Sequence, residues 1–309
     1  MNIIYMGTPD FAIPSLVSLY NEGHNISLVI TQKDKPKGRG KKLQFTPVKE
    51  KALELNLEVF QPDNVNSIES VDKIKGINPD FIIVAAYGQI LRKEILDTPK
   101  YGCLNVHASL LPKYRGAAPI NWAIINGETN TGISIMKMEE GLDTGDVILE
   151  EAVAIEEDDD YLTLHDKLAS LGGRLIVKAI EEILNNNASY TPQDHNKSSY
   201  ASMISKDLGR INWNKSGNEI SNLVRGLKPW PNAFTEYKGE IVKIHRVKFT
   251  EEISSDTPGK ITKVNKNGIF VSVVDGTIII EELQFPGKKV LTVSQYLAGN
   301  SIEEGSILS

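Results

Sequence analysis

Short, almost uninterrupted apolar runs recur in the first part of the chain and alternate with stretches of helical spacing. Because strands of a parallel sheet are buried on both faces, such runs favour a parallel sheet covered by helices. We predict strands over residues 2–6, 26–31, 80–86, 103–107 and 133–138. Pro14 and the pair Thr46-Pro47 are typical of helix starts, and residues 166–185 have the spacing of a long amphipathic helix. The pattern predicts a Rossmann-like, doubly wound and mostly parallel α/β domain over residues 1–189.

The pattern changes after this domain. Residues 190–205 are rich in Ser, Asn, Gln, His and Lys and have the composition of a linker. Beyond them we predict a helix near residues 216–226 and then short strands over 233–237, 241–247, 259–264, 268–274 and 277–283. Five short strands separated by glycine turns favour a small β-barrel over residues 206–309.

Composition narrows the class of protein. The 309 residues suit two domains, and the single cysteine excludes an internal disulfide. Five scattered histidines offer no spacing for structural zinc, and neither a signal segment nor a membrane-spanning run is evident. We therefore expect a cytoplasmic protein that needs no metal and no membrane, and that acts as a monomer.

Charge is distributed unevenly around a formal net charge of −6. Residues 206–309 carry 14 Lys and Arg against 12 Asp and Glu, so they are less acidic than the rest. Residues 33–42 contain six cations and one anion, and their glycines and proline disfavour a helix. This stretch predicts an extended cationic loop that can contact phosphates.

Candidate chemistry is concentrated at Asn105, His107 and Asp143. Residues two apart on a strand project from one face, so Asn105 and His107 would lie side by side. Asp143 lies in a glycine-flanked loop that can return a carboxylate to the imidazole. This set predicts acyl-type transfer. Cys103 lies in an apolar run and is expected to be a buried hydrophobe rather than a nucleophile.

The motifs around these residues resemble the folate-dependent formyltransferase family. The likeness is carried by Asn105-Val106-His107, by residues 109–116 (SLLPKYRG) and by residues 141–146 (GLDTGD). Residues 6–12, 38–42 and 226–231 match members that act on tRNA, and the likeness covers essentially the whole chain. It implies 10-formyltetrahydrofolate as formyl donor, the α-amino group of methionyl initiator tRNA as acceptor, and an OB-like, tRNA-binding barrel at residues 206–309.

The resemblance also implies roles for individual residues. Asn105 would stabilise the oxyanion, and His107 would accept the amine proton or share that stabilisation, with Asp143 favouring its protonated form. Folate contacts are expected from Ser109, Leu110, Leu111, Pro112, Ala85, Tyr87 and Gln89. Contacts with tRNA are expected from Arg39, Lys41 and Lys42, and in the barrel from Arg210, Lys215, Arg225, Lys243, Arg246 and Lys248. Proline-flanked Trp230 is expected to be packed.

Three other functions remain open on the sequence. A formyltransferase acting on a nucleotide sugar would share residues 109–116 but would not need the basic loop. A folate-dependent hydrolase would use water in place of the amine and would have no use for a domain that holds a macromolecule. A non-catalytic RNA-binding protein would not need Asn105, His107 and Asp143 together.

Overall fold

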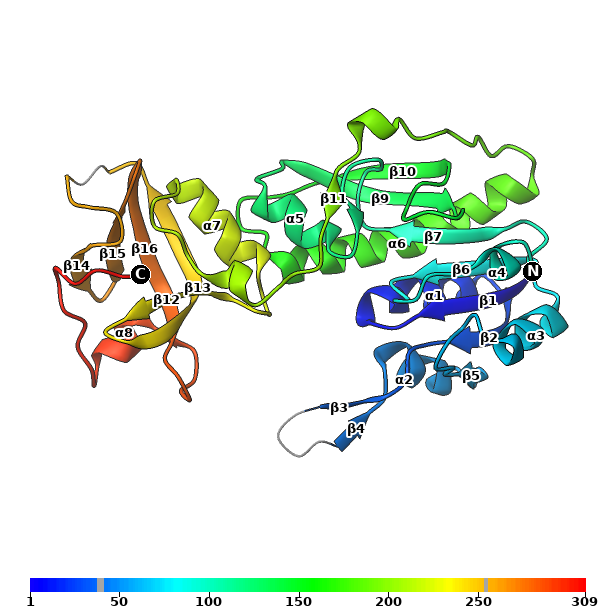
Figure 1. Cartoon of the computed structure of the whole chain (residues 1–309), viewed down its shortest axis with the longest axis horizontal. Helices are drawn as coiled ribbons and strands as arrows, with labels where there is room; N and C mark the ends of the chain where they lie inside the picture. Colours follow the sequence, from blue (N-terminus) through cyan, green and yellow to red (C-terminus); the bar gives the residue numbers. More distant parts are fainter. Residues whose placement is uncertain (38–41, 253–254) are drawn as a thin grey trace. The chain divides into compact units, whose positions relative to one another are not determined.

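The computed structural model describes residues 1–37, 42–252 and 255–309. The chain contacts form two compact units (Figure 1). The first comprises Met1–Pro119, Thr131–Ala154 and His165–Ala201, and the second comprises Ile120–Asn130, Ile155–Leu164 and Ser202–Ser309. Much of the segment expected to be a linker, up to Ala201, therefore makes its contacts within the first unit.

A seven-stranded sheet forms the centre of the first unit, in the order β10-β9-β7-β6-β1-β2-β5. The strands are β1 (Asn2–Gly7), β2 (Asn25–Ile30), β5 (Val59–Phe60), β6 (Phe81–Ala85), β7 (Cys103–His107), β9 (Asn130–Lys137) and β10 (Val147–Ala154). Strand β1 is parallel to β2 and β6, β6 to β7, and β2 to β5, whereas β7 and β9 are antiparallel. The parallel-dominated α/β prediction is confirmed. The strand order reverses between β1 and β6, where such sheets gather ligand groups.

Helices cover both faces of this sheet. They are α1 (Ile13–Asn21), α2 (Pro47–Glu54), α3 (Ile68–Ile77), α4 (Lys93–Leu96) and α6 (Tyr161–Leu184). On one face, Ile74 of α3 and Ile95 of α4 join Ile82 of β6 in a single apolar core. On the other, α6 comes so close to β7 that a Cβ on Gly172 would meet Val106 Cγ1 at 2.7 Å. Strand β7 is therefore held from both sides.

Three elements of this unit differ from the sequence prediction. Helix α6 begins at Tyr161 rather than at 166, because Asp160 Oδ1 accepts the backbone N–H groups of Leu162 and Thr163 and caps the helix. Strand β5 has two residues and β10 lies at the sheet edge with an exposed middle, so neither gives an apolar run. The basic stretch contains a hairpin of β3 (Lys35–Lys37) and β4 (Lys42–Gln44) instead of an unpaired loop.

The second unit has an antiparallel sheet with the strand order β12-β13-β16-β15-β14. The strands are β12 (Ala233–Tyr237), β13 (Glu240–Thr250), β14 (Ile261–Asn265), β15 (Gly268–Val273) and β16 (Gly276–Gln284), with β17 (Leu291–Thr292) pairing with β16. Its helices are α5 (Pro119–Ile125), whose first residue belongs to the first unit, α7 (Gly217–Gly226) and α8 (Val293–Leu297). Ser216 and Glu219 form a capping box that starts α7. The five predicted strands are present, and β17 and α8 are additional.

The C-terminal residues bridge the two edge strands of this sheet. Ser309 exchanges backbone hydrogen bonds with Glu236 of β12, at 2.7 and 3.2 Å. Ile261 of β14 donates to the carbonyl of Ser306, and Leu308 donates to that of Gly259, both at 2.8 Å. The tail thus satisfies the edge groups of β12 and β14 and curls the sheet around its apolar core.

One side-chain prediction in this unit is wrong. Trp230 was expected to be packed between its flanking prolines, but it is 57% exposed.

Candidate active site

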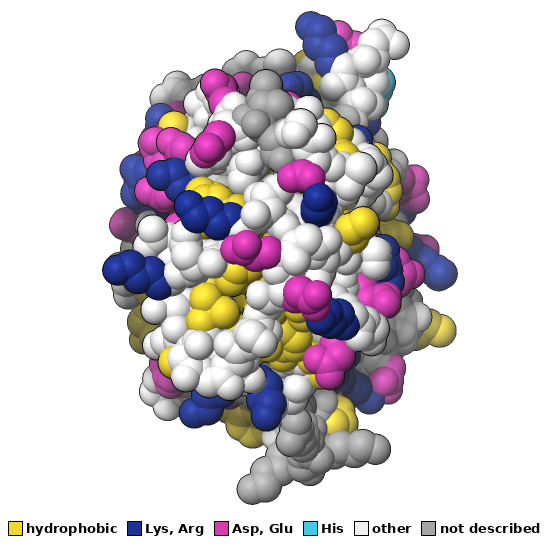
Figure 2. All heavy atoms as spheres, turned by 90° about the vertical axis from the view of Figure 1, so that its left-hand side faces the viewer, with side chains coloured by type: hydrophobic (Ala, Val, Ile, Leu, Met, Phe, Trp, Pro, Cys, Tyr) yellow, Lys and Arg dark blue, Asp and Glu magenta, His cyan; other side chains and the backbone are white. Residues whose placement is uncertain are grey.

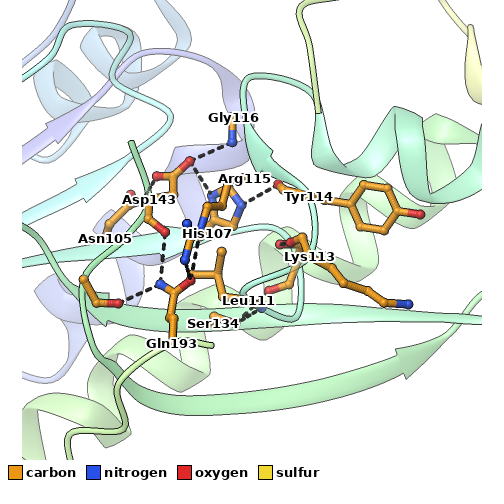
Figure 3. Close-up of polar contacts among 12 residues, drawn as sticks. Asn105, His107, Leu111, Lys113, Tyr114, Arg115, Gly116, Ser134, Asp143 and Gln193 are labelled. Atoms are coloured by element: carbon orange, nitrogen blue, oxygen red, sulfur yellow. Dashed lines mark hydrogen bonds and ion pairs between the residues drawn. The ribbon is translucent and has the colours of Figure 1, made fainter. Parts of the chain in front are cut away.

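Strand β7 presents Asn105 and His107 from the same face (Figure 3). The intervening Val106 points the opposite way, toward Gly172 of α6. Both polar side chains are largely buried, at 9% and 6% exposure. The alternation of the strand therefore places an amide and an imidazole together at its carboxyl end.

The loop after β9 carries Asp143 to this pair. Asp143 has a φ of 52°, in the left-handed region that non-glycine residues seldom adopt. Its Oδ2 accepts the Gly116 N–H at 2.8 Å and lies 3.7 Å from His107 Nδ1, while Oδ1 is 3.5 Å from Asn105 Nδ2 (Figure 3). The structure thus brings together all three residues that the sequence singled out for catalysis.

The hydrogen bond of the His107 ring fixes where a proton can be exchanged. Nε2 lies 3.0 Å from the carbonyl oxygen of Tyr114, which can only accept a hydrogen bond. Nε2 must therefore carry a proton, and Nδ1 is the nitrogen that gains or loses one. Nδ1 is also the nitrogen that faces the Asp143 carboxylate.

The segment from Ser109 to Pro112 leaves β7 through a turn with internal hydrogen bonds. Ser109 is fully buried, and its hydroxyl donates to the Lys113 carbonyl at 2.6 Å. Ser134 Oγ donates to the Ser109 carbonyl at 2.8 Å and accepts the Leu111 N–H at 3.0 Å. Leu110 and Pro112 are half-buried. Among the four residues of this segment that are expected to contact folate, these two have the more accessible side chains.

The other expected folate contacts follow β6. Ala85 is fully buried, and the Tyr87 ring is 2% exposed within the apolar core beneath α3 and α4. Gln89 Oε1 accepts the Val65 N–H at 2.9 Å. The side chains of Ala85 and Tyr87 are thus turned into the protein, contrary to a role as pocket-lining side chains, because this strand end is covered by helices. The exposed residues here are Ala86, Gly88 and Ile90.

Three of the residues expected to contact tRNA belong to the basic stretch of residues 33–42. Arg39 and Lys41 fall outside the described residues. Lys42 begins β4, where its backbone pairs with Lys37. The hairpin itself is in the first unit, which also contains Asn105, His107 and Asp143.

Cys103 starts the strand that carries the site but has no access to it. Its thiol is 1% exposed and donates weakly toward the Ile95 and Leu96 carbonyls, both at 3.8 Å. Burial raises the pKa of Cys103 to about 12. The thiol is therefore neutral at physiological pH, which does not suit a nucleophile.

Two residues beside the site were not assigned a role from the sequence. Gln193 donates to the Asp143 carbonyl at 3.0 Å, and Arg115 donates to Gln193 Oε1 (Figure 3). Arg115 stands within the motif SLLPKYRG, but Gln193 falls in the polar segment that reads as a linker. No local sequence signal connects Gln193 with a loop 50 residues earlier.

Comparison with known proteins agrees with this geometry. Residues 1–180 match the formyl transferase family, and residues 203–301 match the formyl transferase C-terminal domain. The chain is 52% identical to methionyl-tRNA formyltransferase of Alkaliphilus oremlandii over 308 residues, covering 100% of this chain and 99% of the relative. The chain belongs to the methionyl-tRNA formyltransferase family. The enzyme of the same name from Clostridium acetobutylicum is also 52% identical, with the same coverage.

Solved structures share the fold of this family member at lower identity. WlaRD, a sugar 3N-formyltransferase crystallised in the presence of dTDP and 5-N-formyl-THF, has a TM-score of 0.68 and 23% identity, covering 94% of this chain and 99% of its own. HypX from Aquifex aeolicus in complex with tetrahydrofolic acid has a TM-score of 0.65 and 17% identity. That match covers 97% of this chain, which spans about half (47%) of the HypX chain.

The described residues also show no membrane-spanning helix and no cluster of metal ligands. No helix there combines the length and apolar character needed to cross a membrane. No group of three or more His, Cys, Asp or Glu side chains in the same residues is arranged to hold a metal ion.

Proposed function

We propose that this chain transfers the formyl group of 10-formyltetrahydrofolate to the α-amino group of methionyl initiator tRNA, giving N-formylmethionyl-tRNA. The observation that carries this proposal is the Asn105, His107 and Asp143 cluster at the end of β7. It occurs in a chain that is about half identical, over its full length, to enzymes named for this acceptor.

The acceptor amine needs little activation. A free α-amino group has a pKa near about 8, so an appreciable fraction is unprotonated at neutral pH. Its attack forms the new C–N bond and places negative charge on the formyl oxygen. Among the described residues, Asn105 Nδ2 makes one long hydrogen bond, to Asp143 Oδ1 at 3.5 Å, so the second hydrogen of this amide can be donated to that oxygen.

His107 and Asp143 would manage the protons of the reaction. The neutral ring has its free lone pair on Nδ1, which accepts the proton that the attacking nitrogen loses. The resulting imidazolium faces the Asp143 carboxylate, which stabilises its charge. The same proton is then available to the folate nitrogen when its bond to the formyl carbon breaks.

Folate would bind beside the segment from Ser109 to Pro112 and the turn after β6. Half-buried Leu110 and Pro112 offer apolar contacts, and the exposed residues Ala86 and Gly88 would offer backbone hydrogen-bonding groups to a planar ring. On this proposal Ser109, Leu111, Ala85, Tyr87 and Gln89 support the pocket or contribute backbone groups. Equilibrium binding of 5-formyltetrahydrofolate to wild type and Leu110→Ala tests this assignment, and equal affinity would contradict it.

The β3–β4 hairpin would contact the acceptor arm of tRNA through Arg39, Lys41 and Lys42. Its described part supports this proposal, because Leu43 is 71% exposed within a stretch of sequence rich in lysine. Arg39→Ala is expected to raise the KM for tRNA and to reduce its salt dependence. A KM and salt dependence like those of wild type would contradict the assignment.

The C-terminal residues 206–309 would form an OB-like barrel that holds more of the tRNA, joined to the catalytic residues 1–189 through residues 190–205. The antiparallel sheet curled by its own C-terminal tail supports an OB-like shape. In Figure 2, cationic and anionic side chains are interspersed over the face shown, without one contiguous basic patch.

Several cations of this unit already have partners. Arg225 donates to the carbonyls of Glu156, Glu157 and Asp159, and Arg246 pairs with Glu281 and Glu282. Lys215 pairs with Glu219. Arg210, Lys243 and Lys248 are therefore the better candidates for phosphate contacts.

Transfer of labelled formyl from 10-formyltetrahydrofolate tests the proposal. Methionyl initiator tRNA, free methionine and an amino-sugar nucleotide are offered in parallel, with His107→Ala as the control. Formylation of the charged tRNA alone, lost in the variant, supports the proposal. Transfer to the sugar, or release of formate, would assign the chain to a sugar formyltransferase or a hydrolase.

The proposed enzyme would act as a monomer, and it would be located in the cytoplasm. Asn105, His107 and Asp143 all come from a single chain, so a monomer is sufficient. Light scattering during turnover checks this, and activity confined to a larger species would contradict it.

A further inference from the structure

The segment of residues 191–201 runs along both loops of the active site, and we call it the strap. Thr191 exchanges two backbone hydrogen bonds with Val147, each at 2.9 Å. At the other end, β11 (Tyr200–Ala201) pairs in parallel with β8 (Arg115–Gly116). Ser199 accepts the Tyr114 N–H through its hydroxyl, at 2.9 Å. The strap is therefore bonded to the first residue of β10, where the loop after β9 ends, and to the segment after β7.

Gln193 makes the central contact of the strap, and its amide is fully used. Nε2 donates to the carbonyls of Asp143 at 3.0 Å and of Gly145 at 2.7 Å. Oε1 accepts from Arg115 Nε at 3.0 Å and from Nη2 at 2.6 Å. The reversed amide would set its oxygen against two carbonyls and its NH₂ against a guanidinium, so only this orientation is compatible with its neighbours.

Arg115 is buried at 9% exposure and depends on this amide. Its remaining hydrogen bond, from Nη1, goes to His195 Nδ1 at 3.2 Å. Within the described part of the chain, its hydrogen bonds go to these neutral groups, and no ion pair is formed with a carboxylate. A glutamate at position 193 would therefore give this buried cation an anionic partner.

The loop that Gln193 holds has an unusual backbone. Asp143 is in the left-handed region, and Gly145 lies so close to β9 that a Cβ would meet the Lys137 carbonyl oxygen at 1.8 Å. Gln193 bonds the carbonyl on each of these two residues. The distance between the Asp143 carboxylate and His107 therefore depends on where Gln193 holds the main chain.

We propose that Gln193 is a positioning residue for formyl transfer, which sets the Asp143 carboxylate against His107 by holding the main chain of the loop. The inference rests on the proposed function above. The Gln193 side chain bonds Arg115 and the carbonyls of Asp143 and Gly145, and it acts through Asp143. On this proposal the strap, whose sequence has the composition of a linker, contributes to the catalytic step.

Two substitutions of nearly equal size separate positioning from stability. Gln193→Glu and Gln193→Met both remove the two donors to the loop. The glutamate gives Arg115 a carboxylate but sets its other oxygen against the two loop carbonyls, whereas the methionine leaves that guanidinium without its acceptor, so Tm should fall less in Q193E than in Q193M. If Gln193 positions the loop, kcat falls about 10- to 100-fold in both variants.

The readouts are Tm, kcat, and KM for 10-formyltetrahydrofolate and for methionyl initiator tRNA. We expect both KM values within about twofold of wild type, and a changed pH profile of kcat because the carboxylate has moved relative to His107. Asp194→Ala is the matched control, because among the described residues its carboxylate bonds the Asn196 N–H and pairs with Lys197, both within the same strap.

A purely structural role gives a different result. In that case the loss of kcat follows the loss of Tm, small in Q193E and larger in Q193M, which would overturn the inference. Failure of the proposed function is seen separately, as absence of formylmethionyl-tRNA with the wild-type protein. Q193E and Q193M are then assayed with the acceptor that the wild-type protein does formylate. Their kcat and Tm values again distinguish a positioning role from a structural one.

Discussion

His107 Nδ1 lies 3.7 Å from Asp143 Oδ2, while the opposite nitrogen of the ring donates to the Tyr114 carbonyl at 3.0 Å. Nε2 is thereby hydrogen-bonded to the backbone, and Nδ1 faces the carboxylate. Proton exchange during formyl transfer is thus directed to the side of the ring where Asp143 and Asn105 lie.

Asp143→Asn should lower kcat by about 100-fold or more. The amide oxygen can still accept the Gly116 N–H, so the loop is retained, but the charge that stabilises imidazolium is lost. Single-turnover formation of formylmethionyl-tRNA measures the effect. Glu140→Gln removes the same charge from an exposed position just before this loop and should act as wild type. Near-normal transfer by Asp143→Asn across pH would remove Asp143 from the mechanism.

Asn105→Ala should cost about 3–4 kcal/mol of transition-state stabilisation, or about 10²- to 10³-fold in kcat. Because the amide is assigned to the oxyanion rather than to the bound substrates, both KM values should change little. Steady-state kinetics with methionyl-tRNA measures this, with exposed Asn130→Ala as the control. An effect confined to KM would show that Asn105 binds substrate instead.

Lys49→Met should raise the KM for tRNA several-fold and leave kcat nearly unchanged. Lys49 Nζ pairs with Asp34 at 2.5 Å, just before β3, and lies 3.9 Å from the Phe45 ring centroid, just after β4. It therefore fixes both ends of the hairpin proposed to contact tRNA. The control is Lys51→Met on the same helix, where the ion pair with Glu54 is more exposed. Equal KM values in the two variants would contradict this role.

The same ion pair has a pH signature. Burial raises the pKa of Asp34, but hydrogen bonds from Lys49 and Gln61 outweigh it and hold the pKa below its ordinary value of 3.8. The pair therefore stabilises the fold above that value and loses its contribution as pH falls through the lowered pKa. The difference in unfolding free energy between wild type and Lys49→Met should shrink in acid.

Cys103 should make the fold sensitive to alkali. Burial raises the pKa of the Cys103 thiol from 9.0 to about 12. The stability that this neutral thiol contributes is therefore complete well below pH 9, and it is lost as pH rises toward the pKa of the folded state. Between pH 8 and pH 10, wild type should lose about 1 kcal/mol more unfolding free energy than Cys103→Ala. Urea unfolding at the two pH values measures this, and parallel losses would contradict the buried, neutral thiol.

Local patterns in the sequence determined much of the fold. Apolar runs identified β1, β2, β6, β7 and β9, because strands covered on both faces have few polar positions. The apolar pattern did not predict the edge strands β5 and β10, because β5 is two residues long and β10 is largely exposed. Alternation along β7 placed Asn105 and His107 on one face without knowledge of the rest of the chain.

What only the tertiary structure decided is how distant segments meet. The motifs named Asp143, but its approach to His107 depends on a left-handed residue and on a carbonyl held by Gln193, 50 positions later. Tyr87 reads as a pocket residue, yet its ring enters the core because α3 and α4 cover that strand end. A sequence pattern records the periodicity of one element; side-chain contacts between elements, and the hydrogen bonds that fix them, follow only from how the elements pack.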